Sequence, residues 1–189
     1  MYFLVDFENV KNLGLRGTDA LEPEDGLVIF FSETSSRVER RYLEEIERSG
    51  CTFEVCKLVK PYKNALDFHI AAKSGEIFGG GYKGTIAIIS KDEGLKAVRD
   101  YWTHRAKPSH HMVVCESVER AILAAGGPYD PATQHPAIRQ SICTGEMVGG
   151  IMDDRSGKFL ESMLIRDQRD REEFAERVGM EPDKLKVFY

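Results

Sequence analysis

The feature that most constrains the fold is a set of short, unbroken apolar runs. They lie within residues 2–7, 27–31 and 85–90, and each is too short to form a helix of ordinary length. Runs with so few polar residues are typical of strands that are buried on both faces, as in a parallel sheet covered by helices. The sequence therefore predicts an α/β fold.

Segments with apolar residues at helical spacing separate these runs. The expected strands are 2–7, 27–31, 51–58, 85–90 and 112–115, and the expected helices are 36–49, 64–78, 93–102 and 118–125. The run at 51–58 is weaker and alternates between apolar and polar residues, so we expect it near a sheet edge. Alternating strands and helices predict a parallel sheet of about five strands with helices on both faces.

The character of the chain changes after residue 127. Pro128, Pro131 and Pro136 mark a break, and no obvious strand-like run follows them. Residues 137–149, 157–166 and 171–178 are expected to form short helices. We therefore expect an α/β domain at residues 1–127 and a helical C-terminal extension at residues 128–189, which could gate a site or form a dimer.

Composition narrows the classes of partner. The net charge of the 189-residue chain is −5, of which −2 falls in residues 1–127, so nucleic-acid affinity would have to come from local basic patches. No apolar stretch approaches the ~20 residues that span a bilayer, and the first residues do not resemble a signal peptide, which favours a cytoplasmic protein with no membrane association. The four cysteines lack zinc-site spacing and are expected to be reduced thiols.

Carboxylates follow the two strongest apolar runs. Asp6 ends the first run, and Asp92 follows the run at 85–90; the carboxyl ends of parallel strands face the ligand crevice of an open α/β sheet. Asp67 opens the helical pattern between them, with Asn64 three residues earlier on the same helical face. Structural roles remain open: Asp6 as a buried, hydrogen-bonded acid, Asp92 as a helix N-cap, and Asp67 as an acid stabilised by the helix dipole.

Three segments together resemble the PIN-like nucleases, especially their bacterial, NYN-type branch. These are Val5-Asp6-Phe7-Glu8-Asn9-Val10, Lys63-Asn64-Ala65-Leu66-Asp67-Phe68 and Ile88-Ile89-Ser90-Lys91-Asp92-Glu93-Gly94. Their order and their strand and helix contexts match across roughly residues 1–115. The C-terminal extension lies outside the resemblance.

The resemblance implies a Mg²⁺- or Mn²⁺-dependent endoribonuclease that prefers single-stranded RNA. It implies metal ligation and catalysis by Asp6, Asp67 and Asp92, with Asn9 and Ser90 supporting the site. Phosphodiester hydrolysis needs an activated water, a neutralised phosphate oxygen and a stabilised leaving oxyanion, and divalent ions can supply all three. Mg²⁺ prefers oxygen ligands and keeps several waters, so a few carboxylates suffice.

Many relatives carry a fourth acid near the second strand or the helix after it. Glu33 leaves the second strand at its carboxyl end and is the expected fourth catalytic residue. Glu39, farther along in the expected helix, is the competitor. Either residue could instead pair with a nearby arginine.

Substrate binding needs positive charge and a stacking surface beside the acids. Lys63 and Lys91 lie next to the acidic segments, and Tyr62 could stack on an unpaired base, so these three are the expected nucleic-acid contacts.

Two other functions remain open. The chain could be a non-catalytic RNA-binding or protein-interaction module that retains the acidic pocket. It could also be a phosphatase or receiver-like domain with Asp6 or Asp92 as the phosphoryl acceptor. Neither the choice between RNA and DNA nor the presence of a homo-oligomer follows from the sequence.

Overall fold

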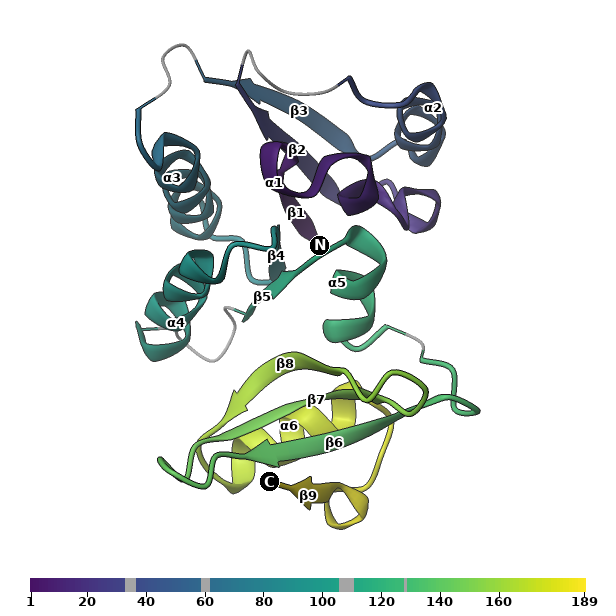
Figure 1. Cartoon of the computed structure of the whole chain (residues 1–189), viewed down its shortest axis with the longest axis vertical. Coiled ribbons are helices and arrows are strands. Elements are labelled where there is room, and N and C mark those ends of the chain that lie inside the picture. The colour runs from purple at the N-terminus through teal and green to yellow at the C-terminus, as the bar shows by residue number, and fades with distance from the viewer. Residues whose placement is uncertain (33–36, 59–61, 106–110, 128) are drawn as a thin grey trace. The chain divides into compact units, whose positions relative to one another are not determined.

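The computed structural model describes residues 1–32, 37–58, 62–105, 111–127 and 129–189. The chain forms two compact units, Met1–Ala121 (unit 1) and Ile122–Tyr189 (unit 2). Figure 1 shows the elements of both units. The boundary lies within one helix and precedes the expected division at residues 127 and 128.

Unit 1 is built on a five-stranded sheet. Its strands are β1 (Tyr2–Asp6), β2 (Gly26–Phe31), β3 (Thr52–Lys57), β4 (Thr85–Ile89) and β5 (His111–Cys115). Their order is β3-β2-β1-β4-β5, and all neighbouring strands are parallel. The predicted α/β fold with five parallel strands is confirmed, and so is the position of β3 at an edge.

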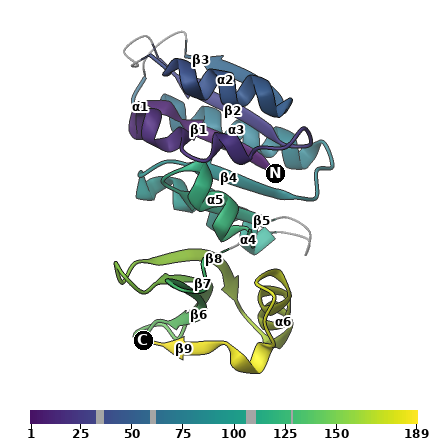
Figure 2. The same ribbon diagram turned by 90° about the vertical axis from the view of Figure 1, so that its right-hand side faces the viewer.

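Helices cover both faces of this sheet, which explains the unbroken apolar runs. The helices are α1 (Phe7–Val10), α2 (Arg40–Ser49), α3 (Ala65–Gly79), α4 (Lys96–Arg105) and α5 (Val118–Ala124), with 3₁₀ turns η1 (Lys11–Leu15), η2 (Thr18–Ala20) and η3 (Glu93–Leu95). Helices α3 and α4 lie on one face, and α1, α2 and α5 lie on the other (Figures 1 and 2). Leu4 and Ile88 on the central strands are fully buried and pack in one cluster with Ile70 of α3.

The edge strand β3 is the exception to this burial. Its side chains are mostly exposed, and Phe53 and Val55 on one face of the strand are 40% and 52% exposed. On the other face, Glu54 forms an ion pair with Lys73 of α3 at 2.8 Å. The alternation of apolar and polar residues in this segment therefore reflects a strand that is covered on only part of its surface.

Unit 2 is a second sheet, which corrects the expectation of a helical extension. Its strands are β6 (Gln134–Gln140), β7 (Met147–Asp153), β8 (Phe159–Ile165) and β9 (Lys186–Phe188), in the order β8-β7-β6-β9. The helices predicted at residues 137–149 and 157–166 are wrong: both segments contain antiparallel strands and their connecting turns. Gly145 and Gly157 in these turns have φ of 74° and 67°, a left-handed conformation that suits glycine.

One helix of unit 2 was predicted in nearly its observed place. Helix α6 (Gln168–Arg177) overlaps most of the expected segment 171–178, and the 3₁₀ turn η4 (Pro182–Lys184) precedes β9. Phe174 of α6 is fully buried in a cluster with Ile138 and Ile151 of the sheet. In the described parts of both units, no helix is long and apolar enough to cross a membrane.

Candidate active site

The first candidate carboxylate, Asp6, lies where the strand order of unit 1 reverses. The chain adds β2 and β3 on one side of β1, and β4 and β5 on the other, so β1 and β4 flank the switch point. Ligands of open α/β sheets bind outside the carboxyl ends of the strands at such a point. Asp6 ends β1, and Ser90 directly follows β4.

Ser90 holds the Asp6 carboxylate. The Ser90 hydroxyl donates a hydrogen bond to Asp6 Oδ2 at 2.8 Å and accepts one from the backbone N–H of Asp92 at 3.0 Å. Asp6 and Ser90 are only 5% and 3% exposed. The hydroxyl therefore connects the end of β1 with the loop after β4 in a place that water scarcely reaches.

Asn9 makes a second connection between the same two segments. Its backbone N–H donates to Asp6 Oδ1 at 3.3 Å, which makes Asp6 the N-cap of α1, and its side-chain Oδ1 accepts from the Lys91 backbone N–H at 3.1 Å. The Asp92 carboxylate accepts from the Gly94 backbone N–H at 2.8 Å and caps η3. Asp6 is thus a buried, hydrogen-bonded acid and Asp92 is an N-cap, so both have the structural roles that the sequence left open. These roles are compatible with a role in catalysis.

A cavity of about 350 Å³ opens at this end of the sheet. It is lined by Asp6, Glu8, Asn9, Ser32, Leu58, Tyr62, Asn64, Ala65, Leu66 and Asp67. We call it the acid cavity. Asp67 is half-buried and lies in the first turn of α3, and Asn64 precedes that helix in a left-handed conformation with φ of 58°. Asp6, Asn9, Asn64 and Asp67 thus face one space, whereas Asp92 and Ser90 do not line it.

The carboxylates of the site disfavour one another's charge. Burial raises the pKa of Asp6, the hydrogen bonds from Ser90 and Asn9 partly lower it, and the charges of Asp67 and Glu8 raise it further. Burial also raises the pKa of Asp67, and the nearby Asp92 adds to the effect. Repulsion therefore extends from Asp6 through Asp67 to Asp92, and a bound cation would relieve it.

The side chains of the acid cavity offer oxygen atoms, the kind of ligand that a divalent cation such as Mg²⁺ prefers. Within the residues that the structure describes, no three acidic, histidine or cysteine side chains come close enough to hold an ion as one group. Asp6 and Asp67 nevertheless line the same cavity. Mg²⁺ in enzymes is usually held by one or two carboxylates together with waters and substrate phosphates, so this pair of oxygen donors is sufficient for it.

Glu8 is an acid that sequence reasoning missed. It lines the acid cavity, and its Oε1 accepts a hydrogen bond from the Ser32 backbone N–H at 3.0 Å and another from the Ser32 hydroxyl. The signal was present, because Glu8 belongs to the segment at residues 5–10 on which the resemblance rests. Glu33 lies outside the described residues. Glu39 is exposed and forms an ion pair with Arg41 at 2.9 Å.

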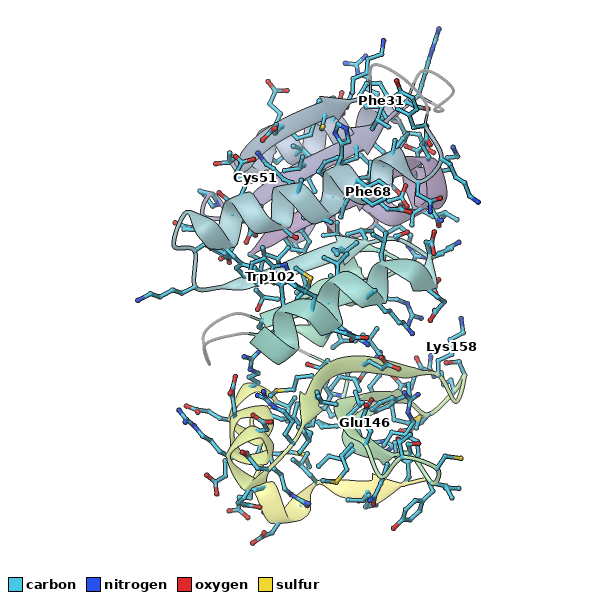
Figure 3. All side chains as sticks on the ribbon, turned by 90° about the vertical axis from the view of Figure 1, so that its left-hand side faces the viewer. Phe31, Cys51, Phe68, Trp102, Glu146 and Lys158 are labelled. Carbon is cyan, nitrogen blue, oxygen red and sulfur yellow. The ribbon has the colours of Figure 1, made fainter. Side chains whose placement is uncertain are left out.

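The expected nucleic-acid contacts divide into two groups. Tyr62 lines the acid cavity with a side chain that is 72% exposed. Lys63 and Lys91 are exposed but do not line the cavity. A second exposed aromatic residue, Phe68, follows Asp67 on α3 and is 69% exposed; Figure 3 shows it at the same end of unit 1 as Phe31, the last residue of β2.

Comparison with known proteins agrees with this architecture. No curated protein and no solved structure matches the chain significantly. A family model for the PIN domain matches residues 1–112, more than half of the chain, and its range covers four of the five strands and the start of the fifth. Proteins of this family are generally metal-dependent nucleases that act on RNA. From the sheet, the acids at its switch point and this match, we conclude that the chain belongs to the PIN domain family.

Proposed function

We propose that this protein is a Mg²⁺- or Mn²⁺-dependent endoribonuclease that cleaves single-stranded RNA. The observation that carries the proposal is the position of Asp6 and Asp67 in one cavity at the carboxyl ends of the strands, in a chain of the PIN family. A bound divalent ion would supply charge neutralisation at the phosphate and activation of water. The narrower assignment to a bacterial, NYN-type branch stays a prediction, as does a cytoplasmic location.

Each residue of the site has a definite task under this proposal. Asp6 and Asp67 hold the cation, and Asp92 adds negative charge near Asp67. Ser90 and Asn9 keep the Asp6 carboxylate in position through two of their hydrogen bonds. Hydrogen-bonded neighbours of this kind orient a metal ligand and commonly affect metal affinity or activity by 10- to 100-fold.

Five further residues would contact the ion's surroundings or the RNA. Glu8, held by Ser32, takes the place of the fourth acid, and Asn64 presents an amide to the cavity. Tyr62 offers an exposed ring on which an unpaired base can stack. Lys63 and Lys91 attract the phosphate backbone from outside the cavity.

The test is Mn²⁺-dependent cleavage of a labelled single-stranded RNA, with single-stranded DNA and RNA duplex as comparison substrates. Asp6→Asn should lower the rate at least about 100-fold, because several kcal/mol of charge stabilisation depend on the ion that it holds. Asp19→Asn is the matched control, since Asp19 is an exposed acid in η2 of the same unit. A wild-type protein without RNA cleavage in Mn²⁺ would contradict the proposal.

One observation favours a second function. Among the described residues, the acids do not form a three-ligand group. The absence of such a group is what a non-catalytic PIN module would show if it binds RNA or protein through the retained cavity. Such a module would bind RNA with equal affinity in Mn²⁺ and in EDTA, without turnover. A receiver-like or phosphatase function has no comparable support, since the chain belongs to the PIN family.

A further inference from the structure

A second, larger cavity lies on the opposite face of the sheet from α3. Its volume is about 760 Å³, and it is lined by Phe7, Ile29, Phe31, Ser32, Arg37, Val38, Leu43, Phe53, Val55 and Lys57. We call it the apolar cavity. Ile29 and Phe31 alternate along β2 with Val28 and Phe30, which belong to the core cluster of α3, so the cavity lies on the face that carries α1 and α2.

The apolar side chains around this cavity are only partly covered by the described residues. Helix α2 buries only Tyr42 and Ile46 fully and leaves Leu43 42% exposed. On β3, Phe53 and Val55 point to the same face and are similarly exposed. Exposed apolar side chains that gather in a concave surface are typical of a binding site. The volume of the apolar cavity also falls in the range of small-ligand sites.

The charges around the cavity specify the kind of ligand. Its charged lining residues within the described chain, Arg37 and Lys57, are both cations, although residues 1–127 carry a net charge of −2. No described side chain forms an ion pair with the Arg37 guanidinium, and Arg37 is exposed. An apolar wall beside cations suits a flat, weakly polar group that is attached to an anion, as a nucleobase is attached to its phosphate.

The two cavities share one lining residue at the end of β2. Ser32 lines both of them, and its backbone N–H and hydroxyl hold Glu8 on the acid side. We propose that the apolar cavity binds one unpaired base of the nucleic-acid strand whose phosphate is cleaved in the acid cavity. This inference rests on the function proposed above and adds to it a subsite for a base neighbouring the cleaved phosphate.

A second copy of the chain is a less suitable occupant. A stable dimer buries about 800 Å² on each partner, most of it on matching and comparatively flat surfaces. The apolar cavity is concave, and the charged residues among its described lining, Arg37 and Lys57, have one sign, so two identical copies of this face would bring these like charges together. A single base avoids both difficulties.

The experiment measures binding apart from cleavage. The full chain is titrated in EDTA against a fluorescein-labelled single-stranded 12-nucleotide RNA, and affinity is followed by fluorescence anisotropy. Phe53→Ala removes the ring from the cavity wall, and Phe53→Trp restores an aromatic surface. Tyr101→Ala is the matched control, because Tyr101 is an exposed aromatic of the same unit that lines neither cavity.

Phe53→Ala should weaken binding about 5- to 100-fold, the range that loss of one base–aromatic stack produces. Phe53→Trp should retain wild-type affinity, and Tyr101→Ala should have no effect. In a series of RNAs with a single abasic position, one position should remove the sensitivity to Phe53. Wild-type affinity of Phe53→Ala would overturn the inference, as would an abasic series without such a position.

Two further outcomes separate this inference from its alternatives. Conversion of a dimer to a monomer by Phe53→Ala, with RNA affinity unchanged, would assign the apolar cavity to a second copy and overturn the inference. RNA binding that depends on Phe53 in a protein that cleaves no RNA in Mn²⁺ would support the base subsite while refuting the nuclease. RNA cleavage in Mn²⁺ together with an RNA affinity that does not depend on Phe53 would support the nuclease and refute the base subsite.

Discussion

Replacement of Ser90 by alanine should destabilise unit 1 more than the loss of one small side chain suggests. The Ser90 hydroxyl donates to a buried carboxylate at 2.8 Å and accepts from the Asp92 backbone at 3.0 Å. A hydrogen bond to a charged group contributes about 1.5–3 kcal/mol and a neutral one about 0.5–1.5 kcal/mol. Asp92 is exposed, so water can replace the second bond, and we expect a total loss of about 1.5–3 kcal/mol, mainly from the bond to Asp6.

The free energy of unfolding can be measured in urea by tryptophan fluorescence. Trp102 is the single tryptophan of the chain, and it lies on α4 of unit 1 in edge-to-face contact with Phe78, so its emission reports on this unit. Ser74→Ala is the matched control: Ser74 is fully buried, but its hydroxyl donates only to the Ala71 carbonyl within α3. Its loss should cost less than about 1 kcal/mol, since alanine favours the helix.

The loss of unfolding free energy caused by Ser90→Ala should be smaller at low pH than at high pH. The Ser90 bond stabilises the ionised form of Asp6 and lowers its pKa against the effect of burial. Loss of the bond raises the Asp6 pKa in the folded variant, so the cost of Ser90→Ala is full above that raised pKa and decreases as the pH falls through it. A loss below about 1 kcal/mol at pH 8, or an equal loss at pH 8 and pH 4, would refute this account of the bond.

Three other changes test separate parts of the structure. Asp6→Asn should abolish cleavage but stabilise unit 1 at pH 8, because burial raises the Asp6 pKa and makes the charged carboxylate costly above that pKa. The gain in stability should disappear below the ordinary pKa of 3.8, which thermal unfolding at pH 8 and at a pH below that value would show. Glu8→Gln should reduce the Mn²⁺-dependent cleavage rate at least about 10-fold and Glu39→Gln should not, and equal rates in kinetic assays would remove Glu8 from the site. Gly149→Ala should destabilise unit 2 by about 1–3 kcal/mol, because a Cβ there would lie 2.8 Å from the Phe174 ring; unchanged amide hydrogen exchange in α6 would contradict this.

The sheet of unit 1 was predictable because its strands are buried on both faces. Leu4 and Ile88 belong to runs that have no solvent-facing side, and such runs are hard to mistake. Unit 2 was not predictable in the same way, since its strands bury at most three consecutive residues, and partly exposed residues flank them. A bulge between Gly149 and Gly150 also interrupts the alternation along β7, and the glycines contribute no apolar side chain to the pattern.

The candidate site was partly predictable for a similar reason. Asp6 directly ends a strong strand, so its place at the edge of the sheet follows from the strand itself. Glu8 is only two residues later, but its direction depends on α1, which turns its carboxylate toward Ser32, the residue after β2. The apolar cavity depends on how much of the face α2 leaves uncovered, and helical spacing alone does not contain that information.

The bonds that hold Asp6 have a consequence for the order in which the protein matures. Ser90 lies 84 residues after Asp6, and Lys91 lies 82 residues after Asn9. During synthesis the first strand emerges long before the residues that complete its carboxylate site. Under the proposed function, a nascent chain from which residues 85–91 have not yet emerged cannot cut the RNA that encodes it, because the site is complete only once β4 has paired with β1.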